Sequence, residues 1–279
     1  MAIEAGNRVP SAAAHGKHGH SLISSGKFRQ LYALALQLQL VGEHDSGWLR
    51  GRGAVLAGVA ADLRSDDTVV AEHAGSRDDI VRGQVRRNMD PRSIEERVIE
   101  ALGQAVGDRM RKTGRVTAIF LDRGQNGKIM QEARALAIDA RLPVLLVEYS
   151  AAKKPRAGKK KKPAALEYPS IPVDTQDVIA LYRVAHESIT RARDGGGPTH
   201  IVGVRWQPAV KSGQRSAKVK TEDAVTHLEQ WLMARGLPAA EWRQEIVAEF
   251  KTKSGGQNLD AKNAVDGERD DESREQRIA

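Results

Sequence analysis

The feature that most constrains the fold is a strand-helix-strand pattern in residues 118–150, AIFLDRGQNGKIMQEARALAIDARLPVLLVEYS. Two nearly continuous apolar runs, RVTAIFL and PVLLVEY, are typical of strands buried on both faces of a parallel sheet. The segment between them has apolar residues at helical spacing, and we expect Ile129, Ala133, Leu136 and Ala140 on its buried face. The pattern predicts a βαβ unit with a right-handed crossover.

Helices and strands are expected to alternate through the rest of the chain, which predicts an α/β fold with a mostly parallel sheet and helices on both faces. Apolar spacing at Leu31, Leu34, Leu38 and Val41 indicates a first helix. Further helices are expected at residues 51–63, 90–114 and 221–250, the last of them broken at RGLP, and further strands at DDTVVAEH and THIVGVRW.

One further helix is expected before THIVGVRW, with Asp174 or Thr175 as its N-cap. It should end at the three glycines of residues 195–197, because glycine is the usual residue after a helix. Its buried face is expected to hold Val178, Leu181, Tyr182, Ala185 and Ile189.

The ends of the chain are polar, which predicts disordered tails at residues 1–20 and 251–279 around one α/β domain at residues 21–250. The chain has no cysteine, so disulfides, thiolate metal sites and thiol nucleophiles are excluded. Neither a membrane-spanning run nor the apolar core of a signal peptide is found, and we expect a cytoplasmic protein.

The net charge is +8, and seven positive charges with no acid lie in the segment from Lys153 to Lys162. The rest of the chain is therefore close to neutral, which excludes a globally basic nucleic-acid binder. Three interpretations of the basic segment stay open: a solvated loop insertion, a site for an acidic partner such as nucleic acid, or a contact with an acidic face of another subunit. With no aromatic residue between the lysines, nucleic acid would be bound through phosphates alone.

Four stretches, in this order, resemble the α subunit of the thiamine-diphosphate-dependent 2-oxo acid dehydrogenases, the E1 component. They are KFRQLYALALQLQLVGEH, GRGAVLAGVAADLRSDDTVVAEH, residues 118–150 and VDTQDVIALYRVAHESITRARDGGGPTHIV. The resemblance implies a thiamine-diphosphate-binding fold, thiamine diphosphate with Mg²⁺ as cofactors, and an E1 β subunit or another E1-like chain as the partner in a heterotetramer. It implies oxidative decarboxylation of pyruvate or a branched-chain 2-oxo acid.

The cofactor motif of that family is altered in this sequence. The family's Gly-Asp-Gly becomes Leu121-Asp122-Arg123, and Tyr149-Ser150 stands where the family has Asn-Asn. The resemblance implies Asp122 as the Mg²⁺ ligand, with cofactor contacts at Asp122, Arg123, Gly124, Asn126 and Ser150; no residue is assigned a catalytic role.

Alternatives stay open for this motif and for the function. Asp122 is either a retained metal ligand or a turn or capping residue, and Arg123 either binds a phosphate in place of Mg²⁺ or is solvated. The chain is accordingly a dehydrogenase E1 α-like subunit with a degraded motif, a non-catalytic structural or regulatory paralogue, or a module that binds through its basic loop.

Other polar and aromatic residues are assigned simpler roles. The cluster of His15, His18 and His20 can bind metal adventitiously, and the remaining five histidines lack ligand spacing. The tryptophans Trp206, Trp231 and Trp242 either pack within the domain or anchor a subunit interface.

Overall fold

The computed structural model describes residues 23–44, 49, 51–72, 74, 76–82, 92–122, 128–149, 169–205 and 223–252. Several predictions fall outside these residues: both tails, the basic segment from Lys153 to Lys162, the cluster of His15, His18 and His20, and the individual residues His73, Arg123, Gly124, Asn126, Ser150 and Trp206.

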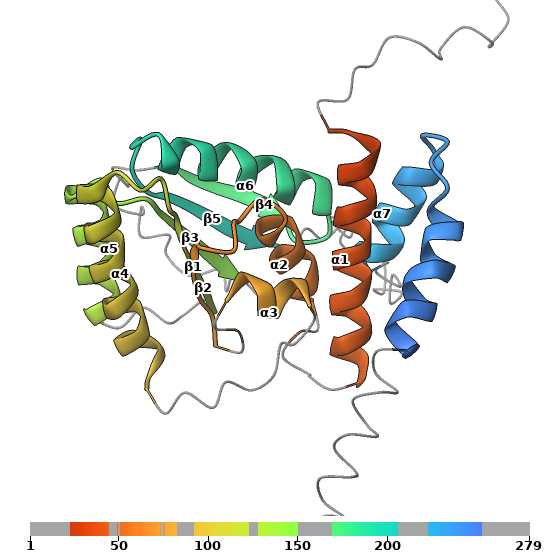
Figure 1. The fold of residues 1–279 in the computed structure, drawn as a ribbon, viewed down its shortest axis with the longest axis horizontal. Coiled ribbons are helices and arrows are strands. Elements are labelled where there is room, and N and C mark those ends of the chain that lie inside the picture. The colour runs from red at the N-terminus through yellow and green to blue at the C-terminus, as the bar shows by residue number, and fades with distance from the viewer. Residues whose placement is uncertain are drawn as a thin grey trace, which may run out of the picture.

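Five strands form one parallel sheet in the order β1-β2-β3-β5-β4 (Figure 1). Their bounds are β1 Thr68–Val70, β2 Thr117–Asp122, β3 Val144–Tyr149, β4 Ser170–Asp174 and β5 Thr199–Val204. The predicted fold class, α/β with a parallel sheet and helices on both faces, is confirmed.

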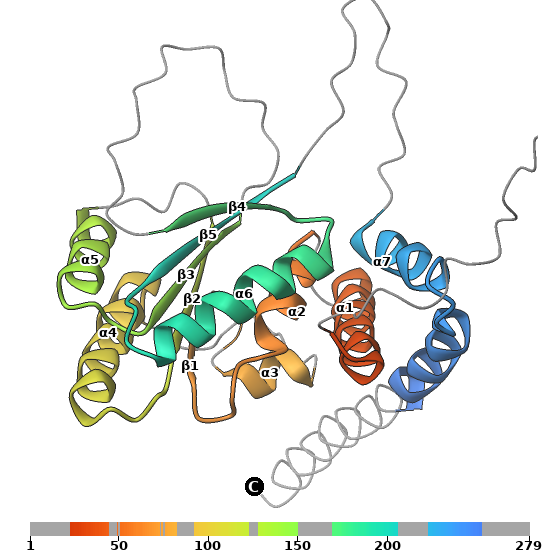
Figure 2. The same ribbon diagram turned by 90° about the horizontal axis from the view of Figure 1, so that it is seen from above.

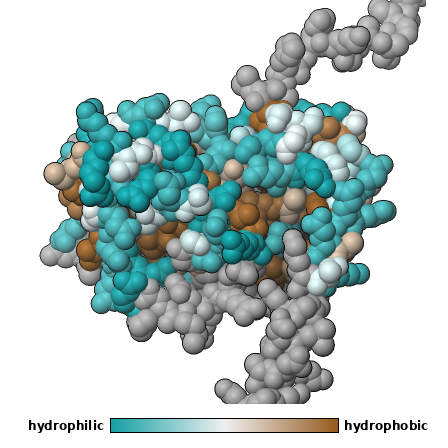
Figure 3. Space-filling model, viewed as in Figure 1, coloured by the Kyte–Doolittle hydropathy of each residue, from teal (hydrophilic) through white to brown (hydrophobic). Residues whose placement is uncertain are grey.

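The helices are α1 Ser25–His44, α2 Gly53–Ala60, α3 Arg77–Val81, α4 Ile94–Arg111, α5 Lys128–Asp139, α6 Val178–Arg193 and α7 Ala224–Met233, and residues 239–252 form one more helix. Helices α4 and α5 cover one face of this sheet, α2, α3 and α6 cover the other, and α1 and α7 lie outside that second layer (Figure 2). One buried cluster joins the sheet to α4 and α5, and a larger one joins its other face to α2, α6, α1 and α7. Teal side chains cover much of the outer surface in Figure 3. No helix among the described residues is long and apolar enough to cross a membrane.

Close backbone packing explains the small residues of α2. All eight residues of this helix are buried, and α2 lies between α1 and α6. A Cβ atom built on Gly58 would lie 2.8 Å from the Cβ of Leu181 and 3.2 Å from the backbone nitrogen of Tyr182 on α6. Only glycine permits this approach, so the sequence of α2 sets the position of the layer that carries the candidate site.

Most sequence expectations for the core are confirmed. Leu31, Leu34, Leu38 and Val41 are buried on α1, and all five residues expected on the buried face of α6 are buried. Trp231 and Trp242 are partly buried against the larger cluster, so both pack within the domain. The ring of Trp231 meets that of Phe28 edge-to-face at 5.2 Å between centroids.

Three features of the local structure differ from the sequence expectations. The N-cap of α6 is Asp177, whose side chain accepts a hydrogen bond from the Ala180 nitrogen, because Asp174 is still in β4. The strand β4 and the short helix α3 were not predicted; β4 lies at the sheet edge, with a mixed burial pattern, and α3 has only five residues.

The buried face of α5 also differs from the expectation. Met130, Ala133 and Ala137 are buried, whereas Leu136 is 47% exposed. The helix is therefore turned so that its alanines, rather than its leucine, pack close to α4 and the sheet.

Candidate functional site

Two residues of the altered cofactor motif meet at the carboxyl edge of the sheet. Asp122 is the last residue of β2, Tyr149 is the last residue of β3, and the two are paired in the ladder between these strands. This edge is where ligands bind in open parallel α/β sheets, because the loops and helix termini converge there. The βαβ unit read from the sequence thus brings both residues to a candidate site.

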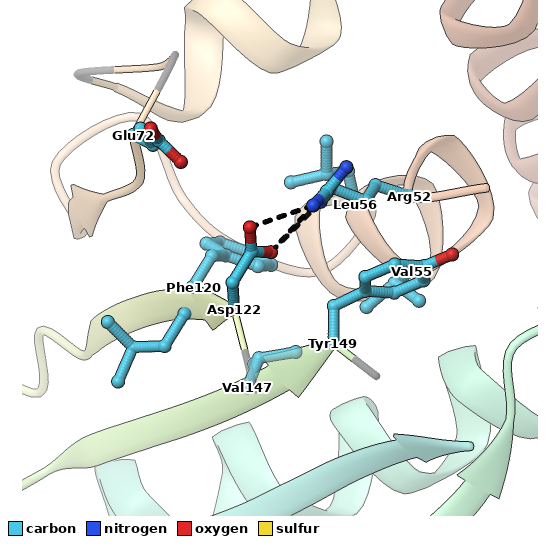
Figure 4. Close-up of a pocket in the computed structure, with 9 residues that line it drawn as sticks. Arg52, Val55, Leu56, Glu72, Phe120, Asp122, Val147 and Tyr149 are labelled. Carbon is cyan, nitrogen blue, oxygen red and sulfur yellow. Dashed lines mark hydrogen bonds and ion pairs between the residues drawn. The ribbon is translucent and has the colours of Figure 1, made fainter. Parts of the chain in front are cut away.

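The carboxylate of Asp122 is held by the guanidinium of Arg52. Arg52 Nη2 donates to Asp122 Oδ2 at 2.8 Å and to Oδ1 at 2.9 Å, and Arg52 Nε donates to Oδ1 at 3.0 Å (Figure 4). The side chains are only 18% and 35% exposed. Both carboxylate oxygens therefore contact a cation that the chain itself supplies.

Tyr149 completes the arrangement by lying against Arg52. The guanidinium carbon of Arg52 is 4.8 Å from the centroid of the Tyr149 ring, within the range of a cation–π contact. Burial raises the pKa of the Tyr149 phenol, while the charges of Arg52 and Arg205 act in the opposite direction. The phenol is therefore protonated at neutral pH and is a poor metal ligand.

A glycine before Arg52 makes room for this ring. Gly51 has a φ angle of +77°, and a Cβ atom built on it would lie 2.5 Å from the Tyr149 hydroxyl oxygen. Both the left-handed backbone and the close contact require glycine here. Gly51 thus permits Arg52 to start α2 as its N-cap and to reach across to β2.

Arg52, Asp122 and Tyr149 border a small pocket with an apolar floor. Its volume is about 350 Å³, part of which is open to solvent, and Val55, Leu56, Phe120, Leu121 and Val147 line it together with Glu72. Figure 4 shows Glu72 on the far side of the pocket from the ion pair. On the other side of Tyr149, a wider hollow of about 1060 Å³, partly open to solvent, reaches Arg205 and the start of α7.

The described residues do not fit a Mg²⁺ ion. Such an ion takes near-octahedral oxygen ligands, yet both oxygens of Asp122 are bound by Arg52, and the first of the two Asn positions holds the Tyr149 phenol. Ser150, at the second position, lies outside the described residues. Within the parts of the chain that the structure describes, no group of three or more metal-ligating side chains comes together. Among the described residues Asp122 is thus half of an ion pair, and its assignment as a Mg²⁺ ligand stays a prediction.

Arg52 is the site residue that the sequence interpretation missed. One signal was available: an arginine at the first turn of an apolar helix opposes the helix dipole, which favours negative charge at that end. A cation placed there needs an acidic partner from elsewhere in the chain. Nothing in the sequence indicates which of the many acids that partner is.

Three of the described histidines contact acids or backbone. His200 Nε2 is 3.6 Å from Glu148 Oε2, His186 pairs with Asp62, and His227 Nδ1 is 3.3 Å from the Gln176 carbonyl oxygen. Among the described residues, these three histidines do not share one site.

The comparisons with known proteins agree with the resemblance read from the sequence. The α subunit of acetoin:2,6-dichlorophenolindophenol oxidoreductase from Bacillus subtilis is 31% identical over 144 residues, which are 47% of this chain and 42% of that protein. The α subunit of the pyruvate dehydrogenase E1 component from Mycoplasma pneumoniae is 30% identical over 100 residues, which are 32% of this chain and 28% of that protein.

Two further comparisons add less. No protein-family model matches the chain. A solved structure of a proposed thiamin diphosphate-dependent enzyme isolated from Mycobacterium smegmatis is 17% identical, covers 55% of this chain and 31% of that chain, and has a TM-score of 0.37. A TM-score of this size does not establish a common fold.

The matched segments cover less than half of the length of either curated relative. They nevertheless confirm the resemblance: over just under half of its length, this chain is similar to the α subunits of these two enzymes.

Proposed function

We propose that this chain is an E1 α-like subunit that acts as a structural or regulatory partner of another E1-type chain and does not itself bind Mg²⁺ with thiamine diphosphate at Asp122. The observation that carries the proposal is the two-pronged ion pair between Arg52 and Asp122. An ion pair at this position neutralises the carboxylate that the family resemblance assigns to the metal.

The energetics favour the closed site over metal binding. A Mg²⁺ ion would have to displace the guanidinium, lose part of its hydration shell, and leave Arg52 without its carboxylate partner. The two cations would also lie within a few ångströms of each other, and like charges at that distance repel. Displacing the guanidinium would also break its contact with the Tyr149 ring, which makes metal binding less favourable still.

The partner in this proposal is an E1 β subunit or a second E1-like chain. The similarity of the chain to α subunits supports this class of partner, and the larger apolar cluster of α1, α2, α6 and α7 supports a core that folds without a cofactor. The 2-oxo acid dehydrogenase activity of the assembly would then depend on cofactor groups in the partner chain.

Isothermal titration tests the proposal directly. The purified chain is titrated with thiamine diphosphate in the presence of Mg²⁺, alone and after mixing with an E1 β subunit. We expect complex formation with the β subunit, seen by size-exclusion chromatography. We expect no saturable heat of binding when thiamine diphosphate is titrated into the chain.

The control variants are Asp122→Asn and Arg52→Gln in the same titration. Saturable 1:1 binding with a dissociation constant of about 1 μM or tighter, lost in Asp122→Asn, would overturn the proposal. Failure to bind any E1-type chain would overturn the assigned role as a subunit.

A further inference from the structure

The wider hollow beside Tyr149 is lined by three side chains whose polar atoms form no hydrogen bond with the described part of the chain. They are the Tyr149 hydroxyl at the end of β3, the Thr175 hydroxyl just after β4 and the Arg205 guanidinium just after β5. Figure 4 shows the Tyr149 hydroxyl pointing away from Asp122. All three groups can donate hydrogen bonds, and three neighbouring strands bring them to one hollow.

Arg205 supplies the positive charge of this set. It is exposed and forms no ion pair with the described residues, whereas Arg52 on the other side of Tyr149 is held by Asp122. Burial raises the pKa of the Tyr149 phenol and the charges of Arg52 and Arg205 oppose this rise, so both guanidinium groups lie near the phenol. A guanidinium beside two hydroxyl donors is suited to an anionic oxygen group.

Two acids also border the hollow and limit the charge of such an anion. Both oxygens of Asp223 accept hydrogen bonds from the first turn of α7, and Glu43 Oε1 accepts one from Gln39 Nε2 at 3.0 Å. Their negative charges repel a doubly charged group more strongly than a singly charged one. A carboxylate therefore fits the hollow better than a doubly charged phosphate.

The rest of the wall is mainly apolar. It is formed by Ala35, Leu49, Ala54 and Val225, with glycines between them. The volume of about 1060 Å³, partly open to solvent, is sufficient for a small organic molecule. A ligand with an apolar body and one charged end matches this lining better than an inorganic ion.

We propose that the hollow binds a small carboxylate with an apolar body, whose oxygens accept hydrogen bonds from Arg205, Tyr149 and Thr175. The guanidinium balances the charge of the ligand, and the two hydroxyls fix its orientation. Asp122, which the family resemblance assigns to the metal, does not line this hollow. All the binding groups come from this chain, so the site does not depend on the proposed E1 partner.

The first test compares ligands that differ in charge or in apolar length. Hexanoate, hexanol and acetate are each titrated into the full chain from about 10 μM to 10 mM, and binding is followed by saturation-transfer NMR. We expect saturable binding of hexanoate with a dissociation constant of about 0.1–1 mM. Hexanol lacks the charge and acetate lacks the apolar body, so each should bind at least about tenfold more weakly. Hexanoate that does not saturate, or that binds no better than hexanol or acetate, overturns the proposal.

A matched pair of arginine variants then locates the site. Arg205→Gln should weaken hexanoate binding at least about tenfold, whereas Arg183→Gln removes an exposed charge on α6 outside the hollow and should leave binding unchanged. Tyr149→Phe keeps the ring beside Arg52 and removes only the hydroxyl, so we expect a loss of about threefold to tenfold. Hexanoate binding that is equal in Arg205→Gln and Arg183→Gln overturns the proposal. The complex with an E1 β subunit is measured separately, so failure of one proposal is distinguished from failure of the other.

Discussion

Arg52 and Asp122 lie 70 positions apart in the chain and form a bidentate ion pair at the end of β2. The pair joins the first turn of α2 to the carboxyl edge of the sheet and lies against the Tyr149 ring. It therefore has two consequences, one for stability and one for what the edge of the sheet can bind.

The ion pair should contribute measurably to stability. We expect a double-mutant cycle of Arg52→Gln and Asp122→Asn to give a coupling free energy of about 1–2 kcal/mol, because the pair is two-pronged and partly buried. Urea unfolding at pH 7 measures it. The same cycle on Arg29 and Glu245, which are 51% and 55% exposed, should give less than about 0.5 kcal/mol. Equal couplings would contradict the special role of Arg52.

Gly51 should tolerate no side chain while Tyr149 is present. Gly51→Ala is expected to lower the free energy of unfolding by about 2–3 kcal/mol, through its positive φ angle and its contact with the Tyr149 hydroxyl. Combining it with Tyr149→Phe removes the hydroxyl and leaves only the backbone strain, so part of the loss should be recovered. A double variant as unstable as the sum of the two single variants would rule out the contact.

Gly58 should be equally restrictive for a different reason. Gly58→Ala drives a methyl group against Leu181 and the backbone of α6, and we expect a loss of about 2–4 kcal/mol in unfolding free energy. Gly26→Ala is the matched control, since only the Ser24 hydroxyl, at 4.0 Å, comes near its Cβ position. The unfolding temperatures of the two variants are compared. If Gly58→Ala unfolds at the same temperature as the wild type, α2 and α6 can move apart at little cost.

The carboxylate of Glu148 should make stability depend on pH. Glu148 pairs with Arg134 from α5 and contacts His200 from β5, and its side chain is 10% exposed. The His200 contact and the positive charges lower the pKa of Glu148 below its usual 4.5, although burial acts in the opposite direction.

A lowered pKa means that the folded state prefers the ionised carboxylate. This stabilisation is complete above pH 4.5 and is lost as the pH falls through the lower pKa of the folded state. The difference in unfolding free energy between the wild type and Glu148→Gln should therefore be constant above pH 4.5 and shrink as the pH is lowered below it. Glu245→Gln, at a site 55% exposed, is the control, and a difference that stays constant with pH would contradict the assignment.

Part of the candidate site could be predicted from the sequence alone. The apolar runs around Asp122 and Tyr149 place both residues at strand ends, and the parallel order of a βαβ unit then places them side by side. The exposed Leu136 shows the limit of the same reasoning, because the apolar spacing of α5 fits two neighbouring faces and the packing of small alanines against α4 selects between them.

The sequence by itself determined the alternation of helices and strands and the parallel sheet, because these follow from periodicity, and the altered motif was identified by its resemblance to the E1 α family. Only the tertiary structure decided that Arg52 is the partner of Asp122. Pairing between residues so far apart depends on where α2 lies over the sheet, which is set by the contact of Gly58 with α6 and the turn at Gly51. Long-range packing of this kind leaves no periodic pattern in the sequence. The ion pair between Arg52 and Asp122 is therefore visible only in the tertiary structure.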